Sequence, residues 1–223
     1  NHIRADNGMF LGIGGVDYGI VQYSDALRFT EELVGQGKAE YVTAGFIGSG
    51  EQAFIIMRTQ DHILLSPSNK IQCYFYLTTS HDSSLGLTVV PSPYVPLSKT
   101  IITPPTKMTI KFKHTKHVMN HLSRAQKSFS KVHESWEKFK TSFEFFKTVT
   151  LTGNQAMQYF ECIFPDSGEA PKRAQNLRND LESIRLTSPV CKLPACHGTL
   201  LGAYLAVIEF IDQHKPVRKP KHN

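Results

Sequence analysis

A change in hydrophobic spacing near residue 115 constrains the fold of this chain more than any other feature. Before it, short runs rich in Val, Ile, Tyr, Phe and Thr alternate with turn residues, which is typical of strands. After it, apolar residues recur at alternating spacings of four and three, which indicates one long amphipathic helix. The apolar seam of that helix consists of Val118, Leu122, Ala125, Phe129, Val132, Trp136, Phe139, Phe143 and Phe146. We therefore predict an α+β protein with an antiparallel β-meander sheet packed on this helix.

In the first half of the chain, the sequence predicts β-hairpins and one helix. Residues 24–37 predict an amphipathic helix with Ser24 as its N-cap. Residues 107–113 alternate, with Ile110 and Phe112 on one face and lysines on the other. The proline-rich residues 91–105 predict a loop or an edge segment. The predicted strands cover residues 9–14, 18–23, 40–48, 52–59, 71–79, 85–91 and 107–113.

The remainder of the chain predicts a helical C-terminal part. We expect helices at residues 152–164, 171–186 and 198–214. The predicted organisation is an α+β core at 1–147, a helical part at 148–214 and a basic disordered tail at 215–223. No apolar run approaches the roughly 20 residues that span a bilayer. The chain does not begin with Met, so we expect an upstream segment.

The positive charge is concentrated in one segment. The net charge is +6, yet residues 99–147 alone hold 11 Lys and Arg against three acidic residues. Such a segment indicates a polyanionic partner, with nucleic acid as the default, although a solvated helix face explains it equally well. The candidate nucleic-acid-binding residues are Lys111, Lys113, His114, Lys116, Arg124, Lys127, Lys131 and Lys138.

Aromatic residues on the predicted strand 71–79 offer a second candidate contact. Tyr74 and Tyr76 could stack on bases if their strand face is open, but we expect them in the core.

The adjacent pair His81-Asp82 is the most conspicuous candidate for chemistry. It lies in a polar stretch between two predicted strands, where Asp and Ser favour turns. We interpret it as a turn; the alternatives are a loop that contacts a phosphate and an enzyme that uses His81, Asp82 and His114.

The remaining patterns do not complete a site. Cys191, Cys196 and His197 form half of a zinc motif with no second half, and His117 and His121 lack the Glu of a zinc protease. The glycine-rich residues 12–19 precede a predicted strand instead of a helix, so they do not fit a dinucleotide site. We predict no catalytic residue, metal or cofactor.

The cysteines point to a reducing compartment. Cys73 lies in a predicted apolar strand and Cys162 on a predicted apolar helix, where free buried thiols are common. A reduced cytoplasm is the simplest setting.

Several motifs together resemble the phage/plasmid-like protein family, a domain of unknown function. They are Arg4-x-Asp6-x-Gly8, a Thr-Ala-Gly hairpin at 43–45, the His81-Asp82 turn and a final helix at 198–214. The match also includes Leu11, Gly12, Tyr18, Val21, Gln22, His114, Gly198, Thr199, Ala203, Tyr204, Ala206, Val207 and Glu209.

The chain departs from the family pattern at two places. Residues 94–101 lack a usual Cys and Asn, and Leu201 and Leu205 stand where Trp and Asn are usual. The element order also looks broadly like single-strand annealing recombinases. That is an analogy at the level of fold.

The resemblance and the charge together imply a non-enzymatic protein that binds nucleic acid in the cytoplasm of a bacterial host. We expect single-stranded DNA as the partner, in phage or plasmid recombination or replication. The alternative is a structural or regulatory homo-oligomer that binds no nucleic acid. Its subunits would associate through the apolar seam of the long helix (the heptad seam) or through strand edges.

Overall fold

The computed structural model describes residues 1–35, 37–102, 109–118, 134, 136–166 and 171–214. These residues form two compact units. Unit 1 takes in Asn1–His62, Gln72–Pro93 and Thr103–Lys138, and unit 2 takes in Ile63–Ile71, Tyr94–Ile102 and Phe139–Asn223. The division at residue 147 and the disordered tail stay predictions, and the tail itself lies outside the described residues.

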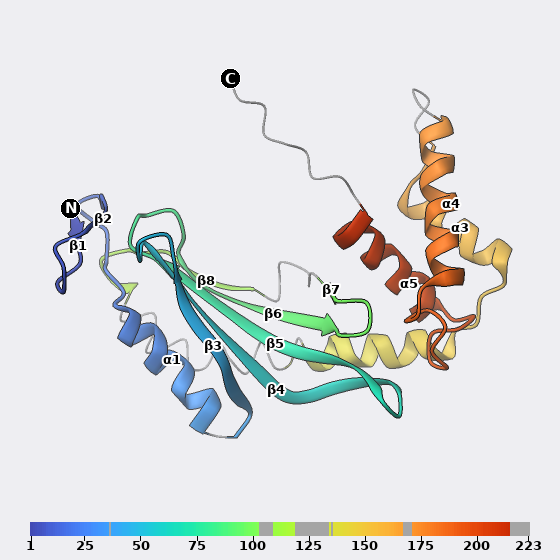
Figure 1. Cartoon of the computed structure of the whole chain (residues 1–223), viewed down its shortest axis with the longest axis horizontal. Coiled ribbons are helices and arrows are strands. Elements are labelled where there is room, and N and C mark those ends of the chain that lie inside the picture. Colours follow the sequence, from blue (N-terminus) through green and yellow to red (C-terminus); the bar gives the residue numbers. More distant parts are fainter. Residues whose placement is uncertain (36, 103–108, 119–133, 135, 167–170, 215–223) are drawn as a thin grey trace. The chain divides into compact units, whose positions relative to one another are not determined.

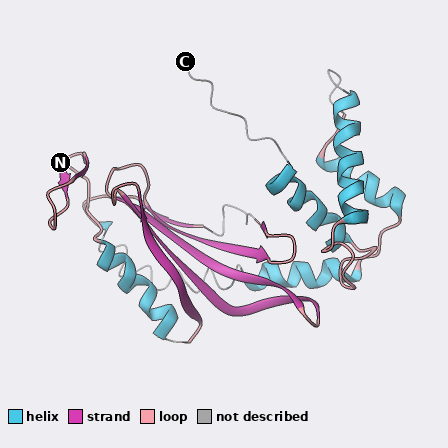
Figure 2. Cartoon of the chain, viewed as in Figure 1, coloured by secondary structure: helices cyan, strands magenta, loops and turns pink. Residues whose placement is uncertain are grey.

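A six-stranded sheet confirms the predicted α+β class (Figures 1 and 2). Its order is β3-β4-β5-β6-β7, with β8 also paired to β6, and β3 runs antiparallel to β4 as do β7 and β8 to β6. The strands are β3 (Ala39–Ile47), β4 (Gln52–Ser66), β5 (Asn69–Ser80), β6 (Leu87–Val95), β7 (Thr100–Ile101) and β8 (Ile110–Phe112). Strand β4 is longer than predicted, because it continues to a tight turn at Pro67-Ser68.

Helix α1 (Tyr23–Gly35) covers one face of this sheet in unit 1. The predicted helix is confirmed, but it begins at Tyr23, so Ser24 lies inside the first turn and is not the N-cap. The Asp25 carboxylate accepts a hydrogen bond from the Gln22 backbone N–H at 3.2 Å, which caps the first turn. The core under the helix consists of Val21, Ala26, Phe29, Ala39, Ile55, Met57, Phe75, Leu77, Leu87, Val89 and Val118.

Strand β6 takes in Pro91 and Pro93 from the stretch predicted as a loop or an edge segment, and the loop alternative is wrong there. Pro91 and Pro93 are buried within the strand. They are tolerated because β8 pairs with residues 87–89 and β7 with residues 94–95. Within the described residues, no strand pairs with the stretch between these two ladders on that side, which is a setting that accepts proline.

The N-terminal hairpin was predicted wrongly. Strand β2 (Phe10–Gly12) pairs with β1 (His2–Ile3), and residues 18–22 form no strand. Backbone groups of residues 18–22 form hydrogen bonds outside any strand ladder; for example, the Gly19 N–H donates to the His114 carbonyl at 3.3 Å. Its partners are distant in sequence, so local spacing could not reveal them.

Unit 2 contains the helices predicted for the C-terminal part. They are α3 (Gly153–Ile163), α4 (Pro171–Thr187) and α5 (Leu200–Glu209), followed by the π-helical turn η2 (Phe210–His214). Their common core consists of Ala156, Phe160, Leu181, Ala203, Val207 and Phe210. Among the described helices, none has the length and apolarity needed to cross a membrane.

The predicted long helix is described only in part, at Val118, Glu134 and residues 136–148. The described residues of its apolar seam pack against other parts of the same chain. Val118 belongs to the core of unit 1, and Phe143 packs edge-on against Tyr204 of α5, with ring centroids 5.3 Å apart.

A capping box at Thr152 fixes the start of α3, and substitution of Thr152 tests it. The Thr152 hydroxyl accepts a hydrogen bond from the Gln155 backbone N–H, and the Gln155 side chain accepts one from the Thr152 N–H. Thr152→Ala is expected to lower the free energy of unfolding by about 1 kcal/mol. Thr152→Ser keeps the hydroxyl and should lose much less. Equal losses in urea denaturation of the two variants would contradict the cap.

Candidate nucleic-acid interface

His81 and Asp82 lie in a turn that is closed by its own side chains. The Ser80 hydroxyl donates to the Leu85 carbonyl and accepts from the Leu85 N–H, both at 3.0 Å. The Asp82 carboxylate accepts hydrogen bonds from the Ser84 backbone N–H at 2.9 Å and from the Ser84 hydroxyl. Burial opposes the charged form of Asp82, but the bonds from Ser84 outweigh it, so the pKa of this carboxyl lies below its ordinary value.

The His81 side chain is a structural anchor. It is only 7% exposed, and its ring stacks in parallel on Tyr23 with centroids 4.2 Å apart. Its Nε2 donates to the Val21 carbonyl at 2.8 Å, and its backbone N–H donates to the Glu51 carbonyl at 2.7 Å. Its own carbonyl accepts from Nδ1 of His2 at 2.5 Å. These bonds join four separate segments of the chain.

His114 is tied in a similar way. Its Nδ1 donates to the Gly19 carbonyl at 3.1 Å, so its Nε2 is left to accept from the Thr79 hydroxyl at 3.2 Å. Its ring stacks on Tyr18 with centroids 5.0 Å apart. Burial lowers the pKa of His114 below its ordinary value of 6.5. Contact of His114 with nucleic acid stays a prediction, while the geometry gives the ring a structural role.

The described residues include no cluster of three or more His, Cys, Asp or Glu side chains placed to hold a metal ion. Burial raises the pKa values of both Cys191 and Cys196 to about 12, so these thiols are protonated at neutral pH. Cys162, which we expected to be buried, is exposed on α3.

Within the described residues, the sheet in unit 1 has one face packed in the core with α1 and one face that is partly exposed. Side chains alternate along a strand, so residues next to core positions point away from α1. Phe75 and Leu77 lie in the core, whereas Tyr74 and Tyr76 are partly exposed. The same alternation holds on β4, β6 and β8. We call the partly exposed surface the open face; it consists of Phe54, Ile56, Arg58, Tyr74, Tyr76, Thr88, Val90 and Lys111.

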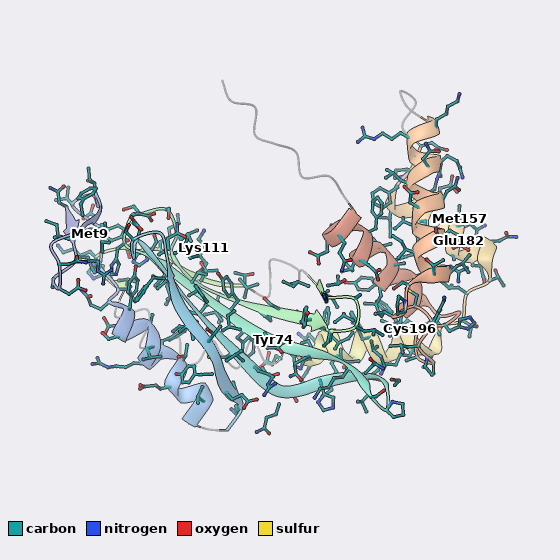
Figure 3. The ribbon with its side chains drawn as sticks, in the orientation of Figure 1. Met9, Tyr74, Lys111, Met157, Glu182 and Cys196 are labelled. Carbon is teal, nitrogen blue, oxygen red and sulfur yellow. The ribbon has the colours of Figure 1, made fainter. Side chains whose placement is uncertain are left out.

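Aromatic rings and cations meet on the open face. The rings of Phe54 and Tyr76 lie 6.1 Å apart and are inclined by 34°. The Arg58 guanidinium donates to Glu40 at 2.6 Å, and this bond, with a smaller contribution from Tyr74, raises the pKa of Arg58. Lys111 is exposed on β8, where it lies opposite Thr88 in the strand register. Figure 3 labels Tyr74 and Lys111 on their strands.

The predicted basic residues fall into two groups. The structure places Lys111, Lys113, Lys116 and Lys138 at exposed positions of unit 1. The second group lies outside the described residues and consists of Arg124, Lys127 and Lys131.

We expected Tyr74 and Tyr76 in the core, and the sequence did not single out Phe54 or Arg58. The alternation of side chains along the strand could have identified them. Phe75 and Leu77 are buried, so the residues adjacent to them in the sequence, Tyr74 and Tyr76, lie on the opposite face.

Comparison with known families covers nearly the whole chain. A family model described as "Domain of unknown function (DUF932)" matches residues 10–223. The chain belongs to this family. No curated protein and no solved structure matches it. The expected membership in a family of unknown function is therefore confirmed, while the link to phages, plasmids and annealing recombinases stays a prediction.

The lowered pKa of His114 predicts how stability depends on pH. In the unfolded chain His114 takes up a proton near pH 6.5, whereas in the folded chain it does so only at lower pH. Its contribution to stability is therefore complete above pH 6.5 and is lost as the pH falls from 6.5 through the folded pKa.

His114→Asn keeps a donor for the Gly19 carbonyl and removes the titration. Urea denaturation at pH 7.5 and pH 5.5 should show a smaller loss of stability in this variant than in the wild type. Equal losses would contradict the assigned neutral ring.

Proposed function

We propose that this protein binds single-stranded nucleic acid, most specifically single-stranded DNA, on the open face of its sheet. The observation that carries the proposal is the row of partly exposed aromatic rings beside cationic side chains, on a face that the core does not use. Exposed aromatic side chains in a basic setting stack on unpaired bases whatever their sequence. Bases within a duplex are already stacked and paired, so this surface favours a single strand.

The spacing of Tyr74 and Tyr76 suits two bases of one strand. Residues two apart on a β-strand lie about 6.8 Å apart on the same face. Phe54 on the neighbouring strand β4 lies beside Tyr76 and widens this platform. We expect one base on each tyrosine, with Phe54 supporting the second.

The cations would contact the backbone of the strand. Lys111 lies on β8, and Lys113 and Lys116 follow it along the chain, all three exposed. Each phosphate that they neutralise releases a counterion, which makes binding depend on salt. Arg58 already bonds Glu40, so we assign it a supporting role beside Tyr74.

The biological setting that we propose is recombination or replication of a phage or plasmid type element in a bacterial cytoplasm. Its support is the resemblance of the Arg4, His81 and C-terminal helix motifs to the phage/plasmid-like family, together with the excess of positive charge at residues 99–147. RNA presents the same stacking chemistry, so a matched RNA oligonucleotide belongs in every binding experiment.

Removal of one ring tests the stacking platform. Tyr76→Ala is expected to weaken binding of a fluorescent single-stranded DNA by roughly 5- to 150-fold, because one stacked base contributes about 1–3 kcal/mol. Tyr76→Phe keeps the ring and should bind nearly as the wild type does.

Tyr41→Ala is the matched control. Tyr41 is paired with the core residue Met57, so it lies on the other face of the same sheet. The platform is wrong if Tyr76→Ala binds as tightly as the wild type, or if Tyr41→Ala loses as much affinity.

Charge reversal tests the phosphate contact. Lys111→Glu should lower affinity and reduce the slope of log K against log salt by about 0.7, the value for one phosphate on a single strand. Lys38→Glu makes the same charge change at another exposed position of unit 1. Anisotropy titrations across a salt series that give both variants the same slope would remove Lys111 from the interface.

A further inference from the structure

Strand β3 is an edge of the sheet that leaves large apolar side chains in solvent. Within the described residues its only ladder partner is β4. Four of its side chains are strongly exposed: Tyr41 at 42%, Val42 at 51%, Phe46 at 60% and Ile47 at 47%. An edge strand also presents unpaired backbone N–H and C=O groups to any strand that approaches it.

This edge has little of the protection that edge strands usually carry. Residues 41–50 include no charged residue and no proline. Two protective features are present. The register with β4 shifts between Tyr41 and Thr43, which marks a bulge at Val42, and the Arg4 guanidinium lies 6.0 Å from the centre of the Phe46 ring. After the bulge, residues 43–47 form a regular ladder, so this part of the edge is straight enough to pair again.

The groove beside this edge is apolar. Ala44 is paired with Ile55, and Phe46 with Ala53, so both side chains lie on the face that α1 covers. A groove of about 320 Å³ opens there between α1 and β3, and Leu27, Ala44, Phe46 and Ile55 are among its lining residues. None of the described residues that line it carries a charge.

We propose that β3 of a second copy of this chain occupies this edge, antiparallel, with Gly45 on the two-fold axis. In that register Ala44 lies opposite Phe46 of the second copy, and Thr43 lies opposite its Ile47. Phe46 of each copy then projects over the apolar groove of the other, because Ala44 lines that groove. A two-fold contact has to be complementary to itself; this pairing joins the apolar side chains of Ala44 and Phe46 and places no charged side chain in the ladder.

The heptad seam is a weaker candidate for the same role. Its described residues are used inside the chain, where Val118, Trp136 and Phe143 are all buried. The β3 edge keeps its apolar side chains exposed, so of these two surfaces it has more to gain from burial.

Pairing of this kind would enlarge the proposed binding surface. Two antiparallel edge strands related by an axis normal to the sheet form one continuous sheet, so both open faces look to the same side. This consequence rests on the proposed function, but the dimer itself does not.

Sedimentation equilibrium of the nuclease-treated protein in high salt tests the dimer, because these conditions remove bridging by nucleic acid. We expect twice the mass of the chain for the wild type and a single chain for Thr43→Lys and Phe46→Lys. Thr43→Lys leaves the Phe46–Tyr23 ring contact in place, so it remains informative if Phe46→Lys fails to fold. Circular dichroism and a thermal scan confirm that each variant is folded.

Leu64→Lys is the control, since it places the same charge on a 54% exposed apolar residue of β4. It should stay dimeric. A monomeric wild type at all soluble concentrations, or a folded Thr43→Lys that remains dimeric, would overturn the proposal. If Tyr76→Ala loses DNA binding but stays dimeric, the two proposals stand independently.

Discussion

Alternation of side chains along β4, β5, β6 and β8 is the constraint on which the rest of unit 1 depends. Every second residue is removed from water by α1 and by its neighbours in the core, and this burial is the main driving force for folding such a layer. The same geometry forces the residues between them onto the opposite face. That face holds Tyr74, Tyr76 and Lys111, so the core and the proposed interface arise from one pattern.

The turn at residues 80–85 adds the connections that alternation cannot supply. His81 bonds the carbonyl of Val21 and stacks on Tyr23, and His114 bonds the carbonyl of Gly19. The segment at residues 18–23 lies outside the strands and is distant in sequence from both histidines, and the imidazole N–H groups satisfy carbonyls that have no ladder partner there. Motifs that are scattered in the sequence therefore meet in one hydrogen-bonded cluster, which gives His81 and His114 a structural role.

Local features were predictable from the sequence and distant ones were not. The hairpin around residues 48–51 and the capped helix α3 follow from turn residues and a capping box that lie within a few positions of each other. The segment at residues 18–22 was predicted as a strand because its composition is apolar, yet its partners are Ser80 and His114.

The residues of the open face could not be predicted from local sequence either. Strand β5 carries apolar or aromatic residues at nearly every position from Cys73 to Leu77, so composition alone could not say which phase faces the core. That choice depends on packing against α1, which only the folded chain reveals.

Photochemical crosslinking of the wild-type protein to iodouracil-substituted single-stranded DNA, followed by mapping of the modified peptides, tests the central claim most directly. Crosslinks on β4 and β5, at Phe54, Tyr74 or Tyr76, are the result that the open face predicts. Crosslinks confined to the helices of unit 2, or no crosslink under conditions in which the DNA is bound, would contradict it.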